Sequence, residues 1–246
     1  MGLLEEGPHD ATVERLVIDA ADGTPLDAVH ARPAGSPEGA LFVHPDMGGL
    51  RSLFEDHCRR LATHGFAVVS TEPFARAPVE VREASDISVR MSYMKHMDDE
   101  QHLGDLAQAA KFIVERDGVD RVSIIGFCMG GMYTLKAAAT GTFACAVPFY
   151  GMIRVPDDWR GPGQRDALAT APDVCPTLAI FGGKDPWTPP DDIEALRFAW
   201  QDRDDCEIVV YPEADHGFVH APERPAHRPD DATDAWERAL AFLRRA

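Results

Sequence analysis

A cysteine stands between two glycines near the middle of the chain, where its thiol could act as a nucleophile. Cys128 forms the pattern G-x-C-x-G with Gly126 and Gly130, after the apolar run 122–125 and before the helix-like run 132–139. A nucleophile on a sharp strand-to-helix turn is exposed above the sheet, and flanking glycines leave room for the strained backbone. The start of a helix also favours a thiolate. The pattern predicts a nucleophilic thiol, although a cysteine outside such a pattern is most often a small buried apolar residue.

An acid and a histidine follow Cys128, each just after an apolar run that is typical of a strand. Asp185 lies in the turn after 178–181, and His216 follows 208–211. The order nucleophile, acid, histidine is that of α/β-hydrolases, and ligand sites of open parallel sheets lie at the carboxyl ends of strands. We predict that His216 is the general base, which takes the thiol proton and later activates water, and that Asp185 orients it.

The alternative role for His216 and its neighbour His220 is to bind a metal ion. His216 and His220 are four residues apart, but Gly217 and Pro222 disfavour the helix that would bring them onto one face, and the motif lacks a third ligand. The Gly-Gly-Lys turn at 182–184 does not have the spacing of a phosphate-binding loop. The sequence therefore predicts no metal and no cofactor.

The elements that carry these residues alternate between strands and helices. Two strand-like runs at the N-terminus, joined by the turn 22–25, predict an antiparallel edge. This alternation predicts an α/β-hydrolase fold, with a mostly parallel central sheet and helices on both faces, in a single domain over residues 1–246. Residues 1–11 are expected to be a loose end. The expected strands are 13–19, 26–32, 40–44, 66–70, 122–125, 144–149, 176–181 and 206–211, and the expected helices are 53–64, 98–116, 129–139, 191–202 and 230–245.

Two stretches depart from this alternation. Residues 75–97 are polar and rich in methionine, and residues 152–173 contain the run Asp-Asp-Trp-Arg-Gly-Pro-Gly. Both leave the carboxyl ends of predicted strands, so both are candidates for the rim of the active site. Ordinary surface loops are the alternative, but long loops in compact domains are usually functional.

The composition limits the partners of the protein. The 246 residues include 24 Lys and Arg against 41 Asp and Glu, a formal net charge of −17. Nucleic acid is an unfavourable partner because phosphate binding needs a basic surface, and an anionic substrate would need a local cation. The five cysteines form no CxxC pair, which argues against a disulfide framework or zinc site. With no signal-peptide pattern and no run of 18 apolar residues, we expect a cytoplasmic protein without a membrane span, for which a monomer is plausible.

The three motifs together resemble the dienelactone hydrolase family. The elbow Gly-Phe-Cys-Met-Gly-Gly (126–131) is similar to that family's cysteine elbow, and the segments 182–185 and 215–218 are similar to its acid and histidine loops. The resemblance extends from about residue 13 to the C-terminus. It implies a Cys-His-Asp catalytic triad on an α/β-hydrolase fold.

Acyl transfer also needs two backbone N–H groups that stabilise the oxyanion. One should be that of Met129, the residue after the nucleophile. The resemblance points to Met47, in the loop after the strand 40–44, for the other, and Gly48 and Gly49 allow this loop to come close.

The resemblance further implies a set of substrate-binding residues. Arg76, in the sequence Phe-Ala-Arg, matches a family arginine that helps hold an anionic substrate, and a guanidinium suits a carboxylate because it donates two parallel hydrogen bonds. Asp46 stands where the family has a glutamate near the resting thiol. His220 occupies the place of a second family arginine, Arg224 is its candidate substitute, and Phe127 of the elbow completes the set. The alternatives are a surface arginine at Arg76 and a solvated loop aspartate at Asp46.

We therefore predict a hydrolase that cleaves a small ester or lactone of the carboxymethylenebutenolide type through an acyl-thioester on Cys128. Enol-type esters should be favoured, because a thiolate is itself a good leaving group. The alternatives are a broad carboxylesterase or thioesterase and a protein that keeps this fold but binds its ligand without turnover. The substrate is anionic if Arg76 acts as a carboxylate clamp.

Overall fold

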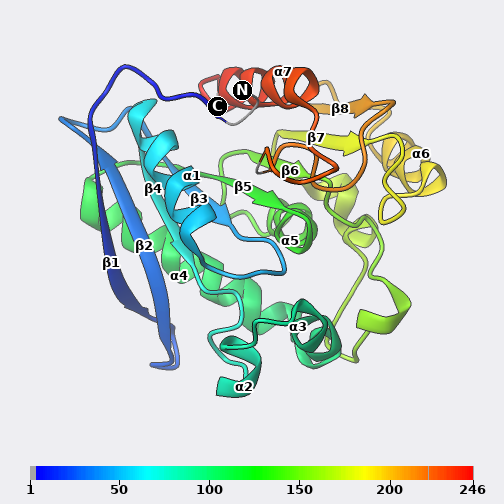
Figure 1. The fold of residues 1–246 in the computed structure, drawn as a ribbon, viewed down its shortest axis with the longest axis horizontal. Coiled ribbons are helices and arrows are strands. Elements are labelled where there is room, and N and C mark those ends of the chain that lie inside the picture. Colours follow the sequence, from blue (N-terminus) through cyan, green and yellow to red (C-terminus); the bar gives the residue numbers. More distant parts are fainter. Residues whose placement is uncertain (1–3, 221, 246) are drawn as a thin grey trace.

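An eight-stranded β-sheet lies at the centre of the structure, a computed structural model that describes residues 4–220 and 222–245 (Figure 1). The strands are β1 (Ala11–Asp19), β2 (Pro25–Pro33), β3 (Gly39–His44), β4 (Phe66–Thr71), β5 (Val122–Phe127), β6 (Ala146–Phe149), β7 (Thr177–Gly182) and β8 (Cys206–Tyr211). Their order across the sheet is β1-β2-β4-β3-β5-β6-β7-β8. β1 pairs antiparallel with β2, and β2 with β4, whereas every pair from β4 to β8 is parallel. The prediction of a mostly parallel sheet with an antiparallel edge is confirmed.

The strand order places a crevice where the sheet can hold a ligand. The chain runs from β3 outward to β4 and then returns to the other side of β3 to form β5. The loops that follow β3 and β5 therefore leave neighbouring strands at the same edge of the sheet. Open α/β sheets bind their ligands at such a switch in strand order.

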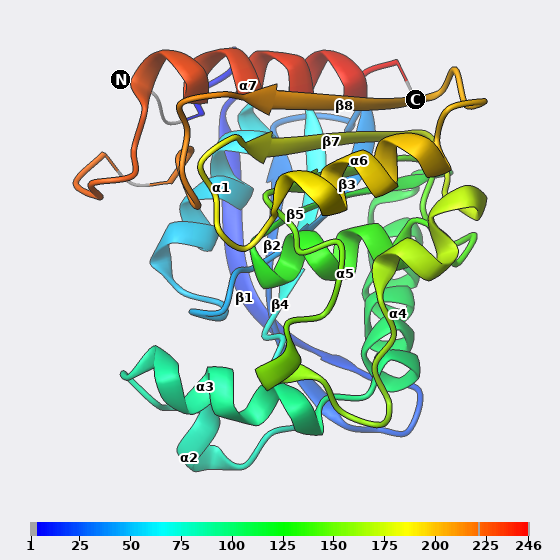
Figure 2. The same ribbon diagram turned by 90° about the vertical axis from the view of Figure 1, so that its right-hand side faces the viewer.

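Helices cover both faces of the sheet, as predicted (Figure 2). α1 (Ser52–Thr63) and α7 (Pro229–Leu243) bury Leu61 and Trp236 in the apolar core of one face. The helices α4 (Asp99–Asp117), α5 (Met129–Ala137) and α6 (Pro190–Ala199) contribute to the core of the other face, with Leu106, Leu135 and Leu196 among their buried residues. Burial of these apolar faces holds the strand ends, and hence the loops above them, in fixed positions.

The two stretches that depart from the alternation form short helices instead of open loops. Residues 75–97 contain α2 (Val79–Arg82), α3 (Ile87–Tyr93) and the turn η1 (Met94–His96), and residues 152–173 contain η2 (Asp157–Trp159) and η3 (Ala167–Asp173). A third apolar cluster joins these segments to the elbow, with Met94, Met97, Met129, Met132 and Trp159 among its members. The richness in methionine is thus explained, since flexible thioether side chains fill irregular space between short elements.

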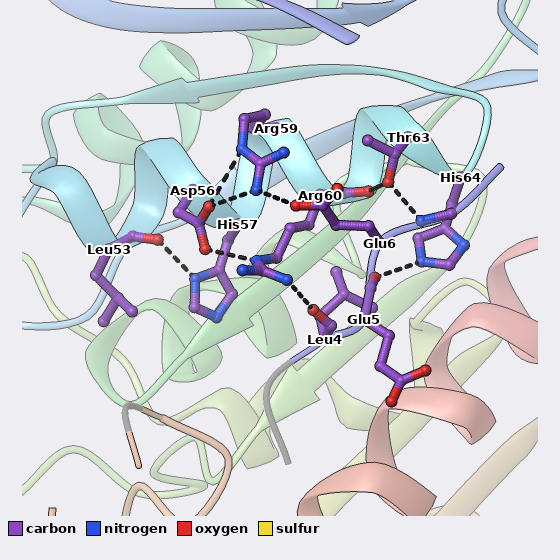
Figure 3. A network of polar contacts seen from close by, with 11 residues as sticks. Leu4, Glu5, Glu6, Leu53, Asp56, His57, Arg59, Arg60, Thr63 and His64 are labelled. Carbon is purple, nitrogen blue, oxygen red and sulfur yellow. Dashed lines mark hydrogen bonds and ion pairs between the residues drawn. The ribbon is translucent and has the colours of Figure 1, made fainter. Parts of the chain in front are cut away.

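The expectation of a loose N-terminal end is wrong for residues 4–10, and residues 1–3 lie outside the described residues. The segment lies along α1, held by polar contacts shown in Figure 3. Arg60 donates to the Leu4 carbonyl at 3.0 Å, His64 Nε2 donates to the Glu5 carbonyl at 2.9 Å, and the Gly7 N–H donates to Thr63 Oγ1 at 2.7 Å. These partners lie in or just after α1, 56 to 59 residues further along the chain, so a local reading of the sequence does not reveal them.

Candidate active site

Cys128 occupies a strained turn between β5 and α5. Its φ and ψ are 58° and −120°, a backbone conformation that costs energy for a residue other than glycine and recurs at functional sites. A Cβ atom at Gly126 would lie 2.3 Å from Thr134 Oγ1, and one at Gly130 would lie 2.3 Å from the Pro45 carbonyl oxygen. The two glycines of the pattern are therefore required by close packing, and they leave the Cys128 side chain as the group that projects from the turn.

The structure brings Asp185 and His216 to the same place as Cys128. The Nδ1 atom of His216 lies 2.7 Å from Oδ2 of Asp185, whose other oxygen accepts a 2.8 Å hydrogen bond from the Trp187 N–H. Burial lowers the pKa of His216, but Cys128 and Asp185 outweigh burial and raise that pKa to about 10. The remaining ring nitrogen, Nε2, is buried and makes no hydrogen bond of ordinary geometry within the described residues. Nε2 is thus available to exchange a proton with the thiol or with a substrate.

A cavity of about 560 Å³ opens above these residues. It is lined by Asp46, Met47, Gly48, Arg51, Ala84, Ser85, Ile87, Arg90, Met91, Cys128, Trp159, Trp187, His216, His220 and Arg224. Residues 84–91 and Trp159 come from the two stretches that depart from the alternation, so both stretches do form part of its wall. The rings of Trp159 and Trp187 are adjacent, with their centroids 5.3 Å apart and their planes tilted by 30°, which gives this wall an aromatic surface.

Sequence reasoning missed several of these lining residues. Trp187 is two residues from Asp185 and Arg51 is five from Asp46, so proximity to predicted site residues was the signal available. Ile87, Arg90 and Met91 belong to the stretch 75–97 that was predicted as a candidate for the rim, but no motif singled them out, and the folding of α3 toward the elbow brings them to the cavity.

The two predicted donors of an oxyanion hole, the backbone N–H groups of Met129 and Met47, lie at the start of α5 and in the loop after β3. Both side chains are buried. Among the described residues, neither N–H donates a hydrogen bond to another part of the chain. Donors left unpaired at a helix start and in an adjoining loop are suited to a developing negative charge.

A second carboxylate and imidazole lie in the same cavity. Arg51 donates hydrogen bonds of 2.5 and 2.9 Å to the two oxygens of Asp46, and the Gly48 N–H adds one of 2.7 Å. His220 Nε2 lies 3.2 Å from Asp46 Oδ2. Burial raises the pKa of Asp46, but His220 and Arg51 outweigh burial and hold that pKa well below its usual range. The pKa of His220 is lowered, chiefly by burial. Asp46 is therefore a paired carboxylate, unlike a solvated loop aspartate.

Two residues of the predicted substrate-binding set lie away from the cavity. Phe127 is completely buried beneath the elbow, where its ring packs against Phe149 at 5.0 Å. Arg76 donates two hydrogen bonds of 2.7 Å to Asp105 and two more, of 2.7 and 3.1 Å, to Asp22. With both sides of its guanidinium engaged, Arg76 connects the loop after β4 to α4 and has no donor directed at Cys128.

Among the described residues, no group of three or more His, Cys, Asp or Glu side chains is arranged to hold a metal ion. Within the same residues, none of the helices combines the length and the apolar character needed to cross a membrane.

An elbow nucleophile on an open, mostly parallel sheet, with an acid and a histidine after later strands, defines the α/β-hydrolase fold. Within this class, the chain belongs to the dienelactone hydrolase family, whose sequence profile matches residues 26–246. The resemblance inferred from the motifs is confirmed, and the protein is a hydrolase of this family.

Individual relatives match along nearly the whole chain. A protein of Escherichia coli (strain K12) named "Putative carboxymethylenebutenolidase" is 32% identical over 243 residues, which are 96% of this chain and 89% of that protein. The crystal structure of a "Putative Dienelactone Hydrolase" from Klebsiella pneumoniae matches with a TM-score of 0.86 at 30% identity, over 96% of this chain and 99% of that one. A Bradyrhizobium protein named "Probable 2-oxo-3-(5-oxofuran-2-ylidene)propanoate lactonase" is 29% identical over 208 residues, 83% of each chain.

Proposed function

We propose that the protein hydrolyses an ester or lactone through an acyl-thioester on Cys128. The observation that carries this proposal is the placement of the Cys128 thiol on a strained elbow, in one cavity with a histidine that Asp185 holds at 2.7 Å. A thiol becomes a good nucleophile as a thiolate, and an imidazole whose pKa is raised by its neighbours can hold the proton that the thiol gives up.

The first half of the reaction forms the acyl-enzyme. The thiolate of Cys128 attacks the substrate carbonyl, so that a C–S bond forms and the carbonyl π electrons move to oxygen. The Met47 and Met129 N–H groups stabilise this oxyanion. Collapse breaks the C–O bond to the leaving group, and protonated His216 gives its Nε2 proton to the departing oxygen. An acyl-thioester and a neutral imidazole remain.

The second half releases the product. Neutral His216 takes a proton from water, and the resulting hydroxide attacks the thioester carbonyl. Collapse of the second tetrahedral intermediate expels the Cys128 thiolate and leaves a carboxylic acid. Acylation removes the interaction with the Cys128 thiolate that raises the pKa of His216, so the ring loses its proton more readily and is available as a general base in the acyl-enzyme.

The chemistry of a thiol nucleophile favours a particular class of substrate. A thiolate leaves a tetrahedral intermediate more readily than an alkoxide, so a simple alkyl ester returns to starting material, whereas an enolate leaving group can compete. Lactones of the carboxymethylenebutenolide type, named for the relatives above, have such a leaving group. If the substrate is an anion, Arg224 is one cation suited to meet it, because it lines the cavity and forms no ion pair with a carboxylate among the described residues. We no longer assign this role to Arg76.

Trapping the acyl-enzyme tests the proposal. We expect that acid quenching during turnover of an enol lactone or aryl ester leaves the acyl mass on the peptide containing Cys128. Cys128→Ala should lower kcat by roughly 10⁴-fold or more, as loss of a triad nucleophile does. Cys206→Ala is the matched control and should keep its activity, because burial raises the pKa of that thiol to about 11. Turnover by Cys128→Ala at the wild-type rate, with no acylated cysteine, would contradict the proposal.

A further inference from the structure

Two buried histidines lie behind the oxyanion loop, the loop after β3 that contains Met47, and have no part in the proposed mechanism. His44 is the last residue of β3 and is 1% exposed; His102 lies on α4 and is 7% exposed. Their Nε2 atoms are 2.8 Å apart, and His44 Nδ1 lies 2.9 Å from the Pro45 carbonyl oxygen. These contacts form a continuous chain from α4 to the loop that contains Met47.

The partners determine which nitrogens carry protons. The Pro45 carbonyl oxygen can only accept, so His44 Nδ1 must donate to it. A neutral His44 then has a lone pair at Nε2, and His102 must carry its proton at Nε2 in order to donate to it. Burial lowers the pKa of His44 to about 4 and that of His102 well below its ordinary value, which keeps both rings neutral. By donating to His44 Nε2, His102 favours the tautomer of His44 that carries its proton at Nδ1. This is the tautomer that donates to the Pro45 carbonyl oxygen.

The same histidine contacts the other half of the oxyanion hole. The His44 ring is stacked on Tyr133 of α5 at 5.7 Å, with an angle of 5° between the ring planes. A Cβ atom at Gly130 would lie 2.6 Å from His44 Nδ1 and 2.3 Å from the Pro45 carbonyl oxygen. His44 is thus packed between the start of α5, which presents the Met129 N–H, and the loop that presents the Met47 N–H two residues after Pro45.

The charged side chains of Lys136 and Arg76 near the two histidines are paired with carboxylates of α4, and neither forms a hydrogen bond with the histidine rings. Lys136 of α5 lies 2.8 Å from Asp99 of α4, and Arg76 is bound to Asp105, one turn of α4 beyond His102. These ion pairs hold α4 against α5 and against the loop after β4. They fix the helix position from which His102 reaches His44.

We propose that His102 and His44 are positioning residues, whose hydrogen-bonded chain sets the distance between the two N–H donors of the oxyanion hole. The inference rests on the proposed function, since it assumes that an oxyanion forms at Cys128. Neither histidine lines the cavity of the described residues, so each acts through the backbone and does not contact the substrate. The proposal predicts that their loss impairs a reaction that develops an oxyanion and spares one that does not.

Comparing two reactions of the same thiol tests this. Hydrolysis of p-nitrophenyl acetate passes through an oxyanion, whereas alkylation of Cys128 by iodoacetamide displaces iodide at carbon and forms none. For His102→Leu we expect kcat for hydrolysis to fall about 10- to 100-fold, somewhat less than the loss of a whole oxyanion donor, with KM little changed. The rate of Cys128 alkylation should stay within about twofold, because the thiol, His216 and Asp185 are untouched.

Conservative variants show that the hydrogen bonds matter, beyond the volume of the side chains. His102→Gln keeps an N–H donor near the position of Nε2 and should recover most of the lost kcat. His44→Asn keeps a donor toward Pro45 and should exceed His44→Leu in hydrolysis, which provides a second test if His102→Leu does not fold. Leu106→Ala, on the same helix and also buried, is the control for lost packing; it should lower stability without changing the ratio of hydrolysis to alkylation.

Three results would overturn the inference. They are an equal loss of hydrolysis and alkylation in His102→Leu, no loss in either reaction, and a His102→Gln variant as impaired as His102→Leu. Failure of the proposed function is distinguishable from these, because hydrolysis would then survive complete alkylation of Cys128 in the unmodified sequence.

Discussion

Two aspartate–histidine pairs lie in one cavity, their histidines only four residues apart, and their electrostatics are opposite. Asp185 holds His216 at 2.7 Å, and the pKa of that ring is raised to about 10. Asp46 lies 3.2 Å from His220, and the pKa of that ring is lowered. The two rings also differ in burial, because the His220 side chain is 1% exposed and the His216 side chain is 17% exposed.

The difference comes from burial and from the other charges that each pair meets. His216 also faces Cys128, and this neighbour raises the pKa of the ring. Burial is the chief cause of the lowered pKa of His220, and Arg224 and Arg51, which shares Asp46 with it, lower that pKa further. A histidine beside an aspartate is therefore not by itself a catalytic base, because deep burial, helped by cations that share the carboxylate, can keep the imidazole neutral.

Removing each histidine in turn should give the largest contrast. His216→Ala should lower kcat by at least about 10²-fold, the usual contribution of a positioned acid–base group. His220→Asn should lower kcat by about tenfold or less, because that ring exchanges no proton with Cys128 in the proposed mechanism. Steady-state kinetics with an aryl ester measures both. A His220 variant as impaired as the His216 variant would mean that the second pair also takes part in proton transfer.

Releasing Asp46 from Arg51 should make the second pair behave more like the first. In Arg51→Met the carboxylate keeps only His220 and the Gly48 N–H as partners, so the pKa of His220 should rise. Loss of the charge-assisted hydrogen bonds should also lower the free energy of unfolding by about 1–3 kcal/mol. Titration of the His220 ring by NMR, with urea unfolding, measures both effects, and Arg59→Met on the same helix is the control. An unchanged His220 titration would show that Arg51 does not set its charge.

The two pairs should also have opposite effects on how stability depends on pH. The folded state raises the pKa of His216 from its ordinary value of about 6.5 to about 10. Its contribution is therefore complete below about pH 6.5 and is lost as pH rises toward about 10. The pKa of His220 is lowered, so that ring opposes folding only as pH falls below about 6.5.

Urea unfolding across this range measures the two contributions. The difference in unfolding free energy between the unmodified protein and His216→Gln should shrink as pH rises, whereas the difference for His220→Gln should grow as pH rises from acid to neutral. Cys128→Ala should weaken the first trend, because the thiolate is one of its causes. Parallel trends for the two variants would refute the contrast between the pairs.

Arg76 shows why a motif does not determine which partner a long side chain meets. The residue follows β4 at the expected edge of the sheet, but its side chain does not line the cavity. Asp22 and Asp105, which occupy its guanidinium, come from a distant turn and a distant helix. A long side chain can be directed toward any partner within its reach, and the sequence around it does not say which carboxylates will be there.

The sequence by itself determined the alternation of elements, the strained elbow at Cys128 and the loops that present Asp185 and His216. These features depend on local physics: apolar periodicity, glycine at close contacts, and the rule that parallel strands end at one edge. Only the tertiary structure decided which cations meet Asp46, how α3 and Trp159 close the cavity, and that His102 reaches His44 behind the oxyanion loop. Those contacts join residues from separate elements, and their geometry exists only once the helices have packed on the sheet.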